Sequence, residues 1–186
     1  MKNFHYFYIP LHRELGYRGR QVPLFCVYNH SMGISEIYDA MEGEIVARGC
    51  FIVDISISKD NDIEITIESE ESSVELEDCV ELSRIFGEKF DRDKEDYSLT
   101  VTSAGLDQPF RTVKQYVKAI GKKVEAALKG GRKLVGVLSA ADSTSVTLEY
   151  SVLEKTEGSK KKTPVLHRDT FPMEEVNYVK YFIEFD

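Results

Sequence analysis

The sequence lacks the features that mark membrane-spanning, secreted and disulfide-linked proteins. It contains no run of about 18 apolar residues, so it predicts no membrane-spanning helix. The first residues carry no small-residue cleavage site, and they predict no secretory signal. The three cysteines are an odd number without a CxxC pair, which argues against a disulfide framework or a zinc knuckle. We therefore expect a cytoplasmic protein.

Motifs for the common catalytic and cofactor chemistries are also missing. The chain has no GxGxxG after a strand, no GxxxxGK followed by Ser or Thr, no HExxH and no GxSxG. His167 is the sole histidine of the regularly patterned part, and its spacing implies neither a nucleophile nor an acidic partner. A metal cluster of His5, His12 and His30 would need a rigid frame, which the pattern around them does not supply. We expect no enzyme activity, no metal site and no cofactor.

The charge is unevenly distributed along the 186 residues, of which 42% are hydrophobic. Basic residues number four against one acidic residue in 1–34, six against twenty in 35–103, and fourteen against eleven in 104–186. The middle segment therefore has a net charge of −14, whereas the whole chain has a net charge of −8 because both flanking segments are positive. Such a segment cannot bind a phosphate backbone by itself, since that affinity depends on cations. Two interpretations stay open for it: a basic protein partner, or a charged surface that serves solubility.

Residues 35–106 predict an acidic α/β domain. Apolar residues recur there first at helical and then at alternating spacing. The predicted elements are a helix that Ser35 caps and Gly49 ends, strands at 51–57 and 63–67, a helix begun by a Ser72–Glu75 capping box, and a strand at 97–102. This α-β-β-α-β order allows two helices to cover one face of a three-stranded sheet.

Residues 107–186 predict a second domain built from short alternating strands. The strands are expected around 124–128, 134–138, 146–150 and 179–185, with tight turns at Gly130–Gly131 and Asp142–Ser143. This spacing is typical of a small closed β-barrel, so the predicted fold class is α+β with two small domains. Residues 1–34 show no sustained periodicity and form an atypical N-terminal extension. Translation from Met1 and translation from Met32 both remain open.

The stretch from Tyr97 to Lys123 joins the two patterns. A short helix is expected there, with a Thr112–Gln115 capping box, an end at Gly121 and an apolar face. That face would consist of Val113, Tyr116, Val117 and Ile120. A basic cluster follows the same stretch, and Glu125 is the single acidic residue within it. Its members are Arg111, Lys114, Lys118, Lys122, Lys123, Lys129, Arg132 and Lys133. Contact with RNA phosphates and a merely solvated surface both explain this cluster.

The joint also resembles a known family. It reads Ser103-Ala104-Gly105-Leu106-Asp107-Gln108-Pro109-Phe110, then a helix ending in Gly121, then Leu134-Val135-Gly136-Val137-Leu138. This arrangement is similar to the RimP family of bacterial ribosome maturation factors, which typically reads S-P-G-L-D-R-P-L, a helix, I-G, and F-x-G-x-L. Ala104 replaces a proline and Gln108 an arginine of that pattern. The resemblance covers residues 32–186.

The resemblance implies a non-catalytic, monomeric assembly factor whose second domain is a Sm-like or SH3-like barrel. Such a factor would bind the immature small ribosomal subunit through its rRNA and help to seat a basic ribosomal protein near the decoding centre. We expect the joint residues to set the geometry between the domains; these are Gly105, Leu106, Asp107, Pro109 and Phe110. The alternative is a Sm-like RNA-binding module that acts elsewhere in RNA metabolism.

Overall fold

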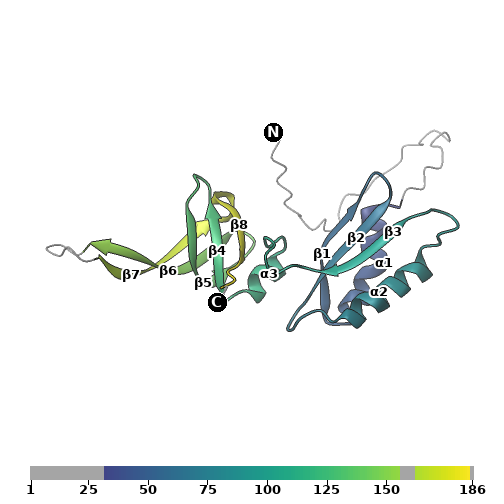
Figure 1. The fold of residues 1–186 in the computed structure, drawn as a ribbon, viewed down its shortest axis with the longest axis horizontal. Helices are drawn as coiled ribbons and strands as arrows, with labels where there is room; N and C mark the ends of the chain where they lie inside the picture. Colours follow the sequence, from purple (N-terminus) through teal and green to yellow (C-terminus); the bar gives the residue numbers. More distant parts are fainter. Residues whose placement is uncertain (1–31, 156–161, 185–186) are drawn as a thin grey trace, which may run out of the picture. The chain divides into compact units, whose positions relative to one another are not determined.

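The computed structural model describes residues 32–155 and 162–184 (Figure 1). Residues from Met32 onward form one compact unit, which contains two separate sheets and two separate hydrophobic cores. The predicted division of the chain at 106/107 therefore stays a prediction. The histidines at positions 5, 12 and 30, and most of the predicted N-terminal extension, lie outside the described residues. Within the described part, no helix is long and apolar enough to cross a membrane.

The first sheet confirms the predicted α-β-β-α-β order. Its elements are α1 (Ile34–Val46), β1 (Cys50–Ile57), β2 (Asp62–Ser69), α2 (Leu76–Lys89) and β3 (Ser98–Ser103) (Figure 1). The strand order is β1-β2-β3, with β1 antiparallel and β3 parallel to the central β2. The parallel pair follows from α2, because a helical crossover returns the chain to the same end of the sheet.

Both helices cover one face of this sheet. Ile63, Ile65 and Ile67 alternate along β2 and are at most 1% exposed. They share a single core with the buried faces of both helices, namely Ile37, Met41 and Ile45 of α1 and Leu82, Ile85 and Phe86 of α2. The opposite face of β2 carries Glu64, Thr66 and Glu68. The predicted alternation of apolar and polar residues is therefore confirmed along the central strand β2.

The starts of both helices differ from the sequence prediction. The residue that caps α1 is Gly33, and no side chain hydrogen-bonds there, so Ser35 already lies within the helix. At α2 the capping residue is Glu75, whose backbone N–H donates to Asp78 Oδ2 at 3.2 Å. Ser72 instead lies in the preceding loop, where its N–H donates to Ser69 Oγ. A capping box thus starts α2, but it lies three residues later in the sequence than predicted.

The second sheet is antiparallel and has five strands in the order β7-β6-β5-β4-β8. They are β4 (Lys123–Leu128), β5 (Lys133–Ala141), β6 (Ser145–Lys155), β7 (Lys162–Pro172) and β8 (Val176–Tyr181), with a 3-10 turn at Met173–Glu175. Among the described strands, β7 and β8 form the two edges and no ladder joins them. The closed barrel predicted from the sequence is therefore replaced by an open sheet.

Glycines explain two close features of this sheet. A Cβ on Gly136 would lie 2.3 Å from the carbonyl oxygen of Glu149, so β5 can run this close to β6 only with glycine there. Gly130 and Gly131 both have positive φ, at 88° and 86°, and they form the predicted tight turn between β4 and β5. The second predicted turn is also present, where Asp142 Oδ1 accepts the backbone N–H groups of Thr144 and Ser145.

Candidate functional site

A short helix in the joint, α3 (Val113–Lys118), contacts residues of both sheets. Thr112 caps it, since the Thr112 hydroxyl accepts the N–H of Gln115 at 3.4 Å. The side-chain oxygen of Gln115 in turn accepts the N–H groups of Thr112 and Arg111, at 3.2 and 2.7 Å. Gly121 follows with a φ of 82° and donates its N–H to the carbonyl of Leu138. The predicted capping box is confirmed, whereas the helix ends at Lys118 with Ala119 as its C-cap, three residues before the predicted end at Gly121.

The apolar face predicted for α3 is mostly exposed. Only Tyr116 enters the core of the second sheet, where its ring meets that of Phe110 edge-on at 5.3 Å between centroids. Burial raises the pKa of Tyr116 to about 12. The other three apolar side chains, those of Val113, Val117 and Ile120, are 46, 53 and 42% exposed. The reason is that polar side chains of α3, not apolar ones, face the first sheet.

The centre of that polar contact is a buried cluster of Glu68, Gln115 and Lys118. The side chain of Gln115 donates from Nε2 to Glu68 Oε2 at 2.8 Å, and Lys118 Nζ lies 3.0 Å from Glu68 Oε1. Glu68 and Gln115 are 9 and 4% exposed. Lys118 Nζ also donates to the carbonyls of Ser69 and Ser72, at 2.8 and 2.9 Å. Every polar atom of the contact therefore has a partner, which a buried ion pair requires.

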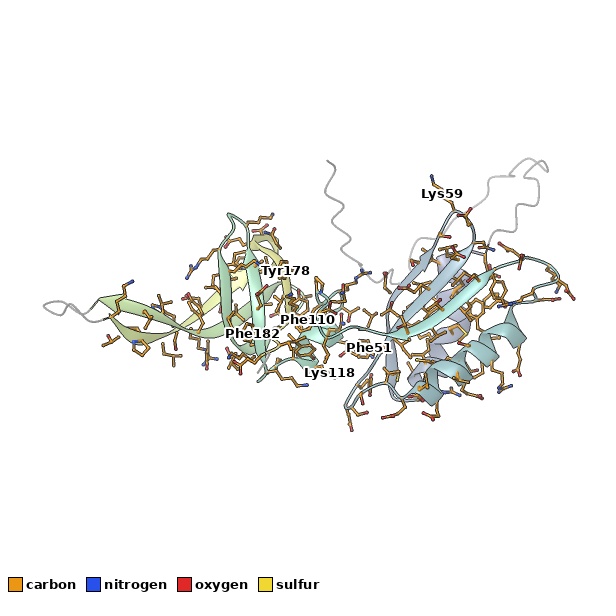
Figure 2. All side chains as sticks on the ribbon, in the orientation of Figure 1. Phe51, Lys59, Phe110, Lys118, Tyr178 and Phe182 are labelled. Carbon is orange, nitrogen blue, oxygen red and sulfur yellow. The ribbon has the colours of Figure 1, made fainter. Side chains whose placement is uncertain are left out.

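Two further cations of the joint surround this cluster on the outer face of the first sheet. Lys114 Nζ lies 2.8 Å from Glu70 Oε1 and 5.2 Å from the ring centre of Phe51 on β1. Phe51 and Lys118 are labelled in Figure 2. Arg111 pairs with Asp54 of β1. The side chains of Arg111 and Lys114 are more than half exposed, unlike that of Lys118 at 14%. All three cations of the helix group, Arg111, Lys114 and Lys118, thus meet acidic residues of the first sheet.

The other five basic candidates lie on β4 and in its flanking turns. We call them the strand group: Lys122, Lys123, Lys129, Arg132 and Lys133. Lys122 precedes β4 and Lys123 begins it. Lys129 and Arg132 lie in the turn after β4, and Lys133 begins β5. The structure therefore does not gather the eight basic residues into one patch. It separates the helix group from the strand group, and it spreads the strand group along β4.

Aromatic and acidic neighbours line the strand group. Lys122 lies over the ring of Tyr181 at 5.5 Å and Lys123 over that of Phe182 at 4.8 Å. Lys123 also pairs with Glu184. At the other end of β4, the Nη2 of Arg132 donates to the Tyr150 hydroxyl at 2.9 Å.

Glu125 is the acidic residue within this group. Tyr178 donates its hydroxyl to Glu125 Oε1 at 2.7 Å, and Lys133 Nζ lies 3.6 Å from the same atom. The hydroxyl of Tyr178, together with the nearby charges of Lys133 and Lys180, lowers the pKa of Glu125. The fixed negative charge offsets part of the local positive potential. Lys129, an exposed cation, has no side-chain partner within the described residues.

The joint itself is short between its two attachment points. Ala104 donates its N–H to Ile67 in the first sheet at 2.9 Å, and Phe110 donates to Val179 in the second at 2.8 Å. Phe110 is 7% exposed, and its ring packs edge-on against Tyr181. Between them, the N–H of Gln108 donates to the carbonyl of Gly105 and closes a turn. Gly105, Asp107 and Pro109 are exposed, as is Leu106 at 65%.

Sequence reasoning placed the cations but missed their partners. Glu68 lies at an outward position of β2, which period-two spacing assigns to solvent. Asp54 follows an irregularity in the β1–β2 register, which the sequence does not reveal. Within the described residues, no group of three or more His, Cys, Asp or Glu side chains could hold a metal ion.

Comparison with known proteins identifies close relatives of this chain. Residues 41–107 match the model of the family described as RimP N-terminal domain. A protein named ribosome maturation factor RimP from Flavobacterium psychrophilum is 34% identical over 121 residues, which are 64% of this chain and 76% of the relative. Proteins of the same name from Porphyromonas gingivalis and Christiangramia forsetii are 32 and 30% identical; the matches cover 68 and 73% of this chain and 82 and 87% of the relatives.

Proposed function

This chain belongs to the RimP family of ribosome maturation factors, and we propose that it acts in assembly of the small ribosomal subunit. In this proposal it binds the immature subunit in the cytoplasm, as a monomer, and assists the incorporation of a basic ribosomal protein near the decoding centre. Its action is binding, without catalysis or a cofactor.

The observation that carries the proposal is the separation of charge within residues 32–184. Residues 35–103 carry −14, and the helix group neutralises only the acids nearest to α3. The strand group lies at the two ends of β4, in the other sheet. One part of the chain thus suits a basic protein, and the other suits a phosphate backbone, because lysine and arginine bind RNA by neutralising phosphates.

The joint supports this division of labour. The largely buried Lys118–Glu68 ion pair and the hydrogen bond from Gln115 to Glu68 hold α3 against β2, so the acidic surface and the strand group are linked through this contact and a short turn. We propose that Gly105, Leu106, Asp107, Pro109 and Phe110 set the geometry between the two sheets. A factor that touches both rRNA and a ribosomal protein benefits from such a link, since positioning the two together lowers the entropic cost of assembly.

Deletion of the gene tests the proposal. We expect more free small subunits, more unprocessed small-subunit rRNA and a stronger defect at low temperature. Reintroducing the full-length gene should reverse all three changes. An unchanged distribution of ribosomal particles on a sucrose gradient would contradict the proposal. Salt-dependent binding assays separate it from the alternative. A general RNA-binding module would bind free RNA as well as it binds immature small subunits.

A further inference from the structure

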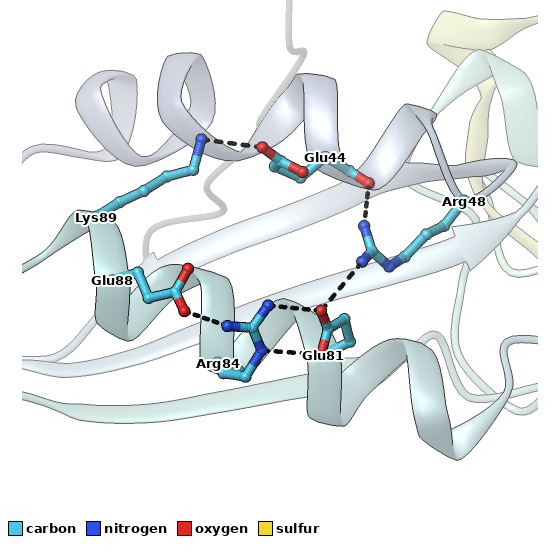
Figure 3. Close-up of polar contacts among 6 residues, drawn as sticks. All are labelled: Glu44, Arg48, Glu81, Arg84, Glu88 and Lys89. Atoms are coloured by element: carbon cyan, nitrogen blue, oxygen red, sulfur yellow. Dashed lines mark hydrogen bonds and ion pairs between the residues drawn. The ribbon is translucent and has the colours of Figure 1, made fainter.

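The two halves of α2 differ in how their charges are paired. From Glu81 onward the charges are paired, since Arg84 bonds Glu81 at 2.8 Å and also pairs with Glu88 (Figure 3). Arg48, which follows α1, reaches Glu81 as well, at 3.8 Å (Figure 3). In the N-terminal half, Glu77 is exposed and takes part in no ion pair within the described part of the chain. Unneutralised negative charge thus lies at the start of the helix.

The same half of α2 exposes two large apolar side chains. Leu76 is 73% and Val80 is 62% exposed, and their spacing of four residues places them side by side on one helix face. Together with Glu77 and Glu81 they line a shallow hollow. Single exposed apolar residues are common on protein surfaces, but an adjacent pair in a hollow with an acidic rim has the composition of a docking site.

Charge decides what can occupy this face. Six acidic residues and no Lys or Arg lie between Glu70 and Glu81. An RNA backbone would be repelled by them. A second copy of this chain would bring Glu77 against Glu77, since a symmetric dimer contacts itself through the same patch. A basic polypeptide segment satisfies both the apolar pair and the acidic rim.

We propose that the α2 docking face, defined as Leu76, Glu77 and Val80, binds a basic segment of a small-subunit ribosomal protein. An apolar side chain of that segment packs between Leu76 and Val80, and its lysine or arginine side chains lie against Glu77 and the acidic residues that precede α2. This inference rests on the proposed function, because it names the surface through which the acidic part of the chain meets its basic partner.

Binding of the full chain to each purified basic protein of the small subunit tests the inference. The double variant Leu76→Ser/Val80→Ser removes the apolar pair and retains every charge, and we expect its Kd for the bound protein to rise about tenfold. Glu77→Gln should raise the Kd by about threefold at low salt and have no effect at high salt. Leu166→Ser, which removes another apolar side chain that is 71% exposed, is the matched control and should leave the Kd within about twofold.

Several outcomes would overturn the inference. A Kd of the double variant equal to that of the wild type, with the protein still bound, would exclude the α2 docking face while the proposed function stands. A wild-type dimer that the double variant loses in sedimentation would identify a second copy as the occupant. Full rescue of the deletion strain by the variant Leu76→Ser/Val80→Ser would also contradict binding at the α2 docking face. In contrast, a deletion strain without any ribosomal defect would reject the proposed function itself.

Discussion

The helix group and the strand group have the same residue types in one continuous stretch of sequence, yet they face different surroundings. The three cations of the helix group meet acidic residues of the first sheet, and Lys118 is nearly buried among its partners. Four of the five cations of the strand group lie beside aromatic rings of the second sheet, and two of them, Lys123 and Lys133, also pair with an acid each. The comparison teaches that positive charge in a sequence says little about its availability until its neighbours are known.

Removing the charge of Lys118 is expected to have the largest effect. Lys118→Met leaves the buried carboxyl group of Glu68 without its cation, and we expect a loss of about 3 kcal/mol in the free energy of unfolding. Urea denaturation followed by circular dichroism measures this loss. Glu68→Gln combined with Lys118→Met should recover much of it, since the unpaired charge is then absent. A loss below about 0.5 kcal/mol, which is the range of ordinary surface substitutions, would contradict the claim that Lys118 is more important for stability than an exposed cation.

The second largest effect is expected on RNA affinity, which substitutions in the strand group should lower more than substitutions in the helix group. Lys129→Gln with Arg132→Gln should weaken binding to a small-subunit rRNA transcript about tenfold and lower the salt slope by about 2, since two phosphate contacts are lost. The matched variant Arg111→Gln with Lys114→Gln removes two charges from the helix group and should leave the slope unchanged. Fluorescence anisotropy at several salt concentrations measures both. Equal slopes for the two variants would abolish the distinction between the groups.

Within the helix group, burial should decide the salt dependence of each pair. Lys114→Gln removes a half-exposed ion pair, so we expect a loss of less than about 1 kcal/mol in the free energy of unfolding. Because salt screens exposed charges, this loss should disappear at about 1 M salt. The loss caused by Lys118→Met should persist under the same conditions. Denaturation of both variants with urea at low and high salt makes the comparison.

The smallest expected effect concerns the acid within the strand group. The folded state lowers the pKa of Glu125, mainly through the Tyr178 hydroxyl, so its ionised form stabilises the fold above the ordinary carboxyl pKa. That contribution is lost as the pH falls through the lowered pKa. Tyr178→Phe should raise the pKa of Glu125 toward its ordinary value and reduce the acid dependence of unfolding. Titration of the Glu125 carboxyl by NMR would show this, and an unchanged pKa would mean that Lys133 and Lys180 suffice.

Much of the first sheet could be predicted from apolar spacing, because β2 and both helices bury one regular face. The Thr112–Gln115 box was equally readable, since capping depends on neighbours in sequence. In contrast, β7 was missed because its side chains are exposed on both faces, so its sequence does not alternate. The buried role of Glu68 could not be predicted, as spacing assigns a residue to a face but does not say what covers that face.

The contact between Glu68 and Lys118 limits how far the two halves of this chain can be treated as interchangeable modules. Glu68 lies in the first sheet and Lys118 lies 50 positions later in the joint, yet each neutralises the other in a largely buried position. A chimera that took its first sheet from one relative and the remainder from another would have to carry both members of the pair. A chimera with only one member of the pair would bury an unpaired charge. It would lose stability at the contact between α3 and β2, although each half had its natural sequence.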